Sequence, residues 1–122
     1  MMQKYEYGLG RDYRVIDGDT IEATLICTFA CDIGFGVTQR IEAAARVKLR
    51  LARIYAPEKD APSTAALQSL LDTHIGTGIV ASTKKSDKYG RYLVELDVLD
   101  GPNINSEMLR LGHATTEPLP KE

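Results

Sequence analysis

The stretch YRVIDGDT, at residues 13–20, places an Asp-Gly pair between two apolar, β-branched runs. Asp17-Gly18 predicts a tight β-turn that joins two strands, because glycine tolerates positive φ and aspartate can hydrogen-bond its own backbone. Such a turn would present the carboxylates of Asp17 and Asp19 at the rim of a sheet, with little apolar cover. Grouped carboxylate oxygens suit a hard cation such as Ca²⁺ or Mg²⁺. Most Asp-Gly turns are only turns, so the rest of the chain must decide the function.

The composition predicts one globular domain without a global affinity for polyanions. The chain has 122 residues, of which 43% are hydrophobic and 26% charged, with a net charge of −2. Any binding of nucleic acid must therefore use a local basic patch. No apolar run approaches transmembrane length, and the N-terminus lacks the apolar middle of a secretory signal. We expect a cytoplasmic monomer without membrane contact, in which Cys27 and Cys31 remain thiols.

Strand signals dominate the chain. In RVKLRLARI, residues 46–54, the apolar Val47, Leu49 and Leu51 alternate with basic residues, which predicts a half-buried strand. The alternation slips at Arg53, which predicts a bulge or the end of the strand. Further strands are predicted at 5–15 (with breaks at its glycines), 20–29, 79–83 and 92–99. Residues 30–42 form a long excursion without a clear period, which a hairpin tip or a bulged extension of the strands would explain, and Ala43 to Ala45 leave a short helical turn open.

Two helices are predicted between and after these strands. Residues 64–74 carry leucines at helical spacing, with Ser63 or Thr64 as the cap and Gly76 as the end. A second helix follows Asn103 or Asn105 and ends before Gly112. The order of elements predicts a mainly β (α+β) fold, a five-stranded OB-fold barrel with two or three packed helices. The domain is expected at residues 1–114, with a short tail at 115–122.

Four polar clusters could act together on a phosphodiester: Asp17 with Asp19, Arg50, Glu58, and the loop at residues 87–91. Taken singly, each is commonplace, because strand arginines are usually solvated or paired and acidic or Lys-Tyr-Gly-Arg segments are common in loops and turns. Taken together, the acids could hold a cation, two arginines could bind a phosphate in a bidentate manner, and a free carboxylate could activate water. That combination is sufficient for metal-assisted hydrolysis.

The chain resembles the staphylococcal nuclease-like (thermonuclease) family. The segments that carry the resemblance are VIDGDTI (15–21), VKLRLARIYAPE (47–58), DKYGRYLVEL (87–96) and NINSEMLRLGHA (103–114). They cover most of the chain in the order of the family, and the family fold is an OB barrel with helices. The resemblance implies a nuclease that cleaves DNA and RNA with little sequence preference and leaves 3′-phosphate ends. The insertion with DIGFGV resembles that of phage or prophage members.

The resemblance also implies catalytic roles for particular residues. Arg50 matches the arginine that contacts the scissile phosphate, and Arg91 matches the second catalytic arginine. Glu58 matches the glutamate proposed as general base or water-orienting group. Lys88 and Tyr89 match residues that contact a neighbouring phosphate of single-stranded DNA or RNA. Lys84 and Lys85 add to the basic character of this loop.

The implied metal site departs from the family pattern. Asp19 matches the Ca²⁺-binding aspartate, and Asp17 is its acidic neighbour. Tyr55 stands where the family usually has a second metal-binding Asp, or sometimes Asn. A phenol is uncharged at neutral pH and is a poor Ca²⁺ ligand, so we expect weakened Ca²⁺ affinity. The backbone carbonyl of Ala56, Asp17 or water would have to compensate.

A second departure lies in the tail, where residues 115–118 read TTEP and lack the aromatic residues that grip substrate in the family's archetype. Two main hypotheses follow. The first is an active, Ca²⁺-dependent endonuclease. The alternative is a catalytically impaired nuclease-like domain that serves as a nucleic-acid or protein binding module. A purely structural role, for example in phage assembly, has no sequence feature behind it.

Overall fold

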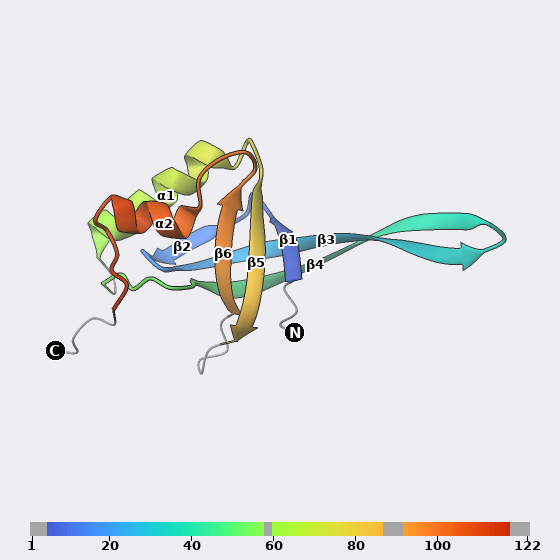
Figure 1. The fold of residues 1–122 in the computed structure, drawn as a ribbon, viewed down its shortest axis with the longest axis horizontal. Helices are drawn as coiled ribbons and strands as arrows, with labels where there is room; N and C mark the ends of the chain where they lie inside the picture. The colour runs from blue at the N-terminus through green and yellow to red at the C-terminus, as the bar shows by residue number, and fades with distance from the viewer. Residues whose placement is uncertain (1–4, 58–59, 87–91, 118–122) are drawn as a thin grey trace.

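The computed structural model describes residues 5–57, 60–86 and 92–117. In these residues the fold is mainly β with two helices, as predicted (Figure 1). The strands and helices, in chain order, are β1 (Tyr5–Leu9), β2 (Arg14–Asp17), β3 (Thr20–Gly34), β4 (Val37–Leu51), α1 (Ala61–His74), β5 (Ile79–Ser86), β6 (Tyr92–Val98) and α2 (Ile104–Arg110). Neither helix is long and apolar enough to cross a membrane.

Five strands close into a barrel, as the sequence predicts. The pairing runs β1-β5-β6-β4-β3, and β3 returns to β1 through Gly8 and Ile26. The pairs are antiparallel except for β4 with β6, which run parallel. The short β2 pairs with β3 on the edge opposite β4. Closure leaves few free edges in the barrel itself.

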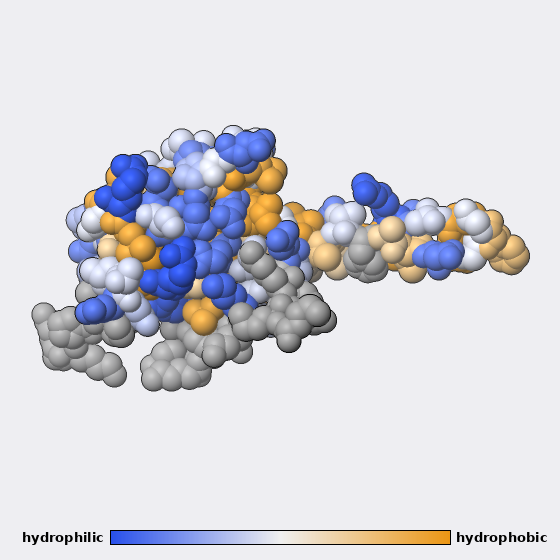
Figure 2. Space-filling model, in the orientation of Figure 1, coloured by the Kyte–Doolittle hydropathy of each residue, from blue (hydrophilic) through white to orange (hydrophobic). Residues whose placement is uncertain are grey.

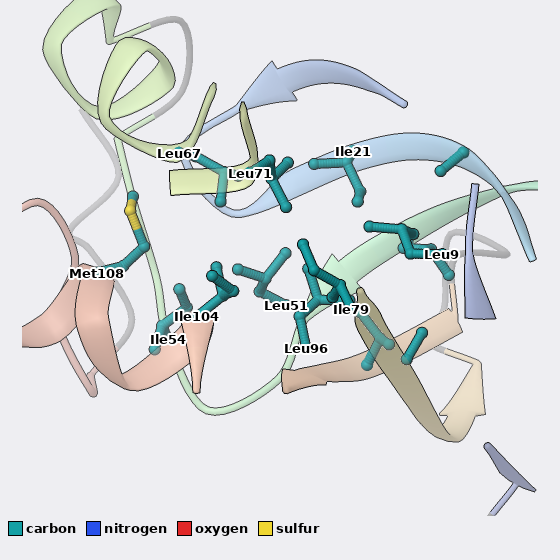
Figure 3. Packing of buried hydrophobic residues seen from close by; sticks show 14 of the residues in the cluster. Leu9, Ile21, Leu51, Ile54, Leu67, Leu71, Ile79, Leu96, Ile104 and Met108 are labelled. Carbon is teal, nitrogen blue, oxygen red and sulfur yellow. The ribbon is translucent and has the colours of Figure 1, made fainter. Parts of the chain in front are cut away.

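The core lies between the barrel and the two helices (Figure 3). Alternate residues of the strands face inward, so Ile21, Leu49, Leu51, Val94 and Leu96 are fully buried. Helix α1 contributes Leu67 and Leu71 from one face, and α2 contributes Ile104 and Met108. Burial of each large aliphatic side chain is worth about 1.5–3 kcal/mol. The core thus fixes both helices against the same end of the barrel.

The helix ends agree with the prediction only in part. Asn103 caps α2 by accepting a hydrogen bond from the Ser106 amide, and Gly112 follows the helix with φ of 79°. For α1 the predicted cap was wrong, since Asp60 rather than Ser63 or Thr64 precedes the first turn. Asp60 accepts from both the amide and the hydroxyl of Ser63, and these hydrogen bonds lower the pKa of the Asp60 carboxyl. Pro62 in the first turn makes this earlier start favourable.

The hairpin of β3 and β4 is much longer than expected. Its strands pair from Thr20 with Arg50 out to Gly34 with Val37, with a register shift between Asp32 and Gly34. The predicted strand ends at Phe29 and Arg46 were therefore wrong, and Ala43 to Ala45 belong to β4 rather than to a helical turn. In Figure 1 the far half of the hairpin extends away from the barrel. We call this part, residues 27–43, the arm.

Beyond the end of β4 the chain changes direction, as the slip at Arg53 predicts. Arg53 has φ of 71°, and its guanidinium donates to both carboxylate oxygens of Glu95 at 2.6 and 2.8 Å. Burial raises the pKa of Glu95, but the hydrogen bonds from Arg53 and Asn103 outweigh this and hold it below its usual range. Lys84 lies 3.8 Å from the same carboxylate. Glu95, on β6, thus links Arg53 to Asn103 at the start of α2.

Candidate phosphodiesterase site

The Asp-Gly turn is present, but its glycine is required for a reason other than the predicted one. Asp17 pairs with Thr20, so Gly18 and Asp19 form the connection between β2 and β3. Gly18 is not among the described glycines with positive φ, so this part of the prediction was wrong. A Cβ on Gly18 would lie 2.6 Å from Cβ of Ser63 and 2.9 Å from Cβ of Ala56. Glycine is therefore needed because α1 packs directly on the turn.

This packing buries Asp19, which the sequence places on an open rim. The residue is only 8% exposed. Its Oδ1 accepts the hydroxyl of Thr20 at 3.0 Å, and its Oδ2 accepts the amide of Ala56 at 2.9 Å. A carboxylate held by several donors keeps one orientation. The site therefore contains a buried, oriented carboxylate.

Arg50 lies beside this carboxylate because β3 and β4 are in register. Its backbone pairs with Thr20 on one side and with Leu93 of β6 on the other. The guanidinium Nη2 lies 3.4 Å from Oδ2 of Asp19, and Nη1 donates to the Leu51 carbonyl at 2.8 Å. Its side chain is 13% exposed. Arg50 is thus held in place by two acceptors while it still reaches solvent.

The ring of Tyr55 stacks on the Arg50 guanidinium. The Cζ atom of Arg50 lies 4.7 Å from the centre of the Tyr55 ring, a cation–π distance. Two backbone hydrogen bonds with Thr115, of 2.8 and 2.9 Å, fix Tyr55 to the segment after α2. Sequence reasoning treated Tyr55 as a lost ligand and missed this stacking, and it also missed the hydroxyl of Thr20. An arginine and an aromatic residue five positions apart carry no local signal of such a contact.

Of the predicted site residues, the structure brings together Asp19, Arg50, Tyr55 and Ala56, with Asp17 at the end of the same turn. Four others, Glu58, Lys88, Tyr89 and Arg91, lie outside the described residues. The described chain next to two of them is nonetheless close to the site. Ala56 precedes Glu58 by two positions and contacts Asp19, and Tyr92, which follows Arg91, pairs with Leu49.

The described part of the site offers few ligands for a cation. Within the described ranges, no group of three Asp, Glu, His or Cys side chains converges. Ca²⁺ takes 6–8 oxygen ligands, so two carboxylates would leave most positions to water. Asp19 shares Oδ2 with Arg50 and Ala56, but Oδ1 accepts a neutral hydroxyl and keeps a lone pair. Ala56 faces Asp19 with its amide, and the predicted contact of its carbonyl with a metal stays a prediction.

Comparison with known proteins relates this chain to a nuclease family. Residues 48–121 match the family model described as staphylococcal nuclease homologue. This range includes Arg50, Tyr55 and Ala56 and begins after the turn that carries Asp17 and Asp19. Two curated proteins named "Uncharacterized endonuclease", from Escherichia coli O157:H7 and Escherichia coli, are each 33% identical to this chain over 109 residues. The match covers 86% of this chain and 58% of each relative's length.

Proposed function

The chain belongs to the staphylococcal nuclease homologue family, and from this we propose that it is a Ca²⁺-dependent nuclease that hydrolyses phosphodiester bonds of DNA or RNA with little sequence preference. The observation that carries the proposal is the contact of Arg50 with Asp19, which joins a guanidinium and a carboxylate from two strands at one partly open position. The name of the two relatives from Escherichia coli supports an endonuclease.

Arg50 is the residue we assign to the scissile phosphate. Two of its nitrogen atoms already donate hydrogen bonds to protein acceptors, so the guanidinium does not need to reorient when a phosphate binds. A donor fixed in advance stabilises the charge that develops on the phosphoryl oxygens in the transition state. Tyr55 and Asp19 act as positioning residues, because one stacks on the guanidinium and the other pairs with it. Glu58 and Arg91 are proposed as the water-orienting base and the second arginine.

We propose that Asp19 and Asp17 hold the Ca²⁺, with weakened affinity. A divalent cation bound there would neutralise phosphate charge and polarise the phosphoryl group. The pairing of Asp19 with Arg50 competes with the cation for the same carboxylate, and Tyr55 brings no charge. Single-stranded DNA or RNA is the proposed substrate, since the loop with Lys88 and Tyr89 would contact an adjacent phosphate.

The direct test is cleavage of labelled single-stranded DNA and RNA oligonucleotides with Ca²⁺, with Mg²⁺ and with a chelator. We expect cleavage with Ca²⁺ and none with excess chelator. A Glu58→Ala variant should lower the rate by about 10²-fold, the usual effect of removing one preorganised catalytic group. A pure protein that leaves both substrates intact over a wide range of Ca²⁺ concentrations would end the proposal.

The weakened metal site makes a separate prediction for Tyr55→Asp. The variant adds a carboxylate, and we expect its Ca²⁺ dissociation constant, measured by calorimetry, to fall about tenfold, which corresponds to about 1.4 kcal/mol. Tyr55→Asn is the matched control, because it removes the ring equally but adds no charge. Equal Ca²⁺ affinities of wild type and Tyr55→Asp would show that Tyr55 does not occupy a ligand position.

The contact of Arg50 with Asp19 also favours the alternative of a binding module. An ion pair that is stacked under Tyr55 satisfies both charges without a metal. A module would bind single-stranded oligonucleotides in the presence of chelator and would not cleave them when Ca²⁺ is added. The same oligonucleotides, followed by fluorescence anisotropy and by gel, therefore distinguish the two functions.

A further inference from the structure

In the described part of the chain, no third strand pairs with the arm. Beyond Ile26, the described residues of β3 pair with β4 alone, and β4 pairs with β6 only from Leu49 to Leu51. An isolated two-stranded hairpin is marginally stable in water. The arm is nevertheless a continuation of two barrel strands, so its side chains keep the alternation of the barrel.

One face of the arm is apolar and exposed. Alternation places Cys31, Val37 and Ile41 on the side that faces the core within the barrel, together with the polar Gln39, and Asp32, Arg40 and Glu42 on the opposite side. Ile33 lies at the register shift between Asp32 and Gly34. Ile33, Val37 and Ile41 are 57%, 47% and 37% exposed. Figure 2 shows hydrophobic residues at the far end of the arm. Monomeric proteins rarely leave a largely apolar strip of this kind exposed without a partner.

The tip of the arm adds an aromatic side chain at a conformational cost. Phe35 and Gly36 form the two-residue turn between Gly34 and Val37, with φ of 55° and 75°. Such turns favour Asn or Gly at the first position, and left-handed backbone costs most other residues roughly 1–2 kcal/mol. Phe35 is fully exposed and makes no compensating contact in the described chain. The stability of the hairpin therefore does not explain this residue.

A pocket of matching character lies where the arm meets the barrel. It has a volume of about 260 Å³ and is lined by Leu25, Cys27, Ala45 and Val47 of the hairpin, with Tyr7 and Tyr92 from β1 and β6. The four hairpin residues lie on the apolar face of β3 and β4. The strip thus runs from this pocket to Phe35 at the tip. A phenyl ring is small enough to fit within a cavity of this volume.

We propose that two copies of this chain dimerise through their arms, which pack antiparallel with the apolar faces together, so that Phe35 of each copy enters the pocket of the other. Phe35, in the turn before β4, and Val47, within β4, are equally many residues from Ile41 in opposite directions along the chain. A single two-fold axis near Ile41 therefore brings both tips to both pockets at once, which is the closure that an isologous dimer requires. A second copy is the favoured partner, because the chain carries both halves of the contact at matched spacing.

The size and charge of the contact are adequate for such a dimer. Sheets pack about 10 Å apart, and an overlap from tip to pocket would extend about 35 Å at ~3.4 Å per residue. Two hairpin faces of this length bury on the order of 1,000 Å², the lower limit for a specific interface. The polar faces with Asp32, Arg40 and Glu42 stay in solvent. This dimer departs from the monomer that we expect from the sequence alone and does not depend on nuclease activity.

The first test is sedimentation velocity of the full chain from about 1 to 100 μM, a range that spans the affinity of a small interface. We expect a dimer that Phe35→Asn weakens at least tenfold. Asparagine tolerates left-handed backbone, so the variant should keep or raise the melting temperature of the wild type. Leu99→Asn is the control, since Leu99 is 51% exposed but lies after β6, away from the arm. A monomer at every concentration, or equal dimerisation of wild type and Phe35→Asn, would overturn the proposal.

The native cysteines provide a second test that needs no change at the tip. Cys27 and Cys31 lie equally far on either side of the β3 residue that pairs with Ile41. The two-fold axis therefore sets Cys27 of one copy opposite Cys31 of the other, about one sheet spacing away. A bismaleimide of that span should cross-link wild type into dimers, and Cys27→Ser or Cys31→Ser alone only weakly. A mixture of the two variants should regain the cross-link. If each single variant alone cross-linked as strongly as the mixture, the placement of Cys27 opposite Cys31 of the other copy would be wrong.

Discussion

An Arg50→Ala variant is expected to cleave single-stranded DNA about 10²-fold more slowly than the wild type, or slower still. The guanidinium is held beside Asp19 and still reaches solvent, with a 13% exposed side chain. Its loss removes a planar donor from the position where phosphate charge would increase. We expect the effect in kcat more than in KM, because the donor acts mainly on the transition state.

Two variants separate this effect from a loss of charge or of folding. Arg46→Ala removes a charge from the same strand, where Arg46 pairs with Asp12 and Glu22 at the surface, and should change the rate by less than about threefold. Arg50→Lys keeps the charge but lacks the bidentate fork, so it should recover only part of the rate. Circular dichroism checks that the Arg50 variants still fold. We expect them to fold, because Asp19 retains Thr20 and Ala56 as hydrogen-bond donors. Equal rates of the Arg46 and Arg50 alanine variants would refute the assigned role.

An Asn105→Ala variant is expected to lose about 3 kcal/mol of unfolding free energy, or more. Asn105 is completely buried at the start of α2. Its Oδ1 accepts the Leu96 amide at 3.1 Å, and its Nδ2 donates to the carbonyls of Ala52 and Val94 at 2.9 Å each. Alanine would leave the Leu96 amide and the Ala52 carbonyl without this partner, while the Val94 carbonyl would still accept the Ala52 amide at 2.8 Å. Each such group costs about 1–3 kcal/mol, and relaxation or entering water offsets part of the sum.

The loss should be visible as a lower midpoint in urea with an unchanged m-value. Ser106→Ala on the same helix is the control, because Ser106 is exposed and should change stability by less than about 0.5 kcal/mol. If the two variants unfolded at the same urea concentration, the buried amide would not be what joins α2 to the barrel.

The local signals of the chain sufficed for most of the barrel. Alternation at Val47, Leu49 and Leu51 identified an inward-facing strand, and all three residues pack in or against the core. The Asp-Gly pair identified the turn between β2 and β3, and Asn103 and Gly112 marked the ends of α2. These features follow from the preferences of single residues and from periods of a few residues, which is why one sequence reveals them.

Local signals failed where two residues had equivalent propensities. Asn103 and Asn105 are both good caps, and only the packing of α2 assigns one to the cap and the other to the buried network with Leu96. Asp60 was passed over as the cap of α1 because Ser63 and Thr64 fit the same pattern. The sequence allowed a hairpin tip at residues 30–42 but not the length of the arm, because that length depends on pairing between distant segments, whose polar and glycine residues hide the period.

The sequence by itself determined the family, the mainly β class and the list of candidate residues, because side-chain type and short-range spacing are written in the order of the letters. The tertiary structure decided that Asp19 is buried under α1, that Arg50 is held between this carboxylate and the Tyr55 ring, and that a long apolar arm leaves the barrel. Those features arise from contacts between segments far apart in the chain, whose geometry is set by closing the barrel and packing its helices, and no local pattern encodes them.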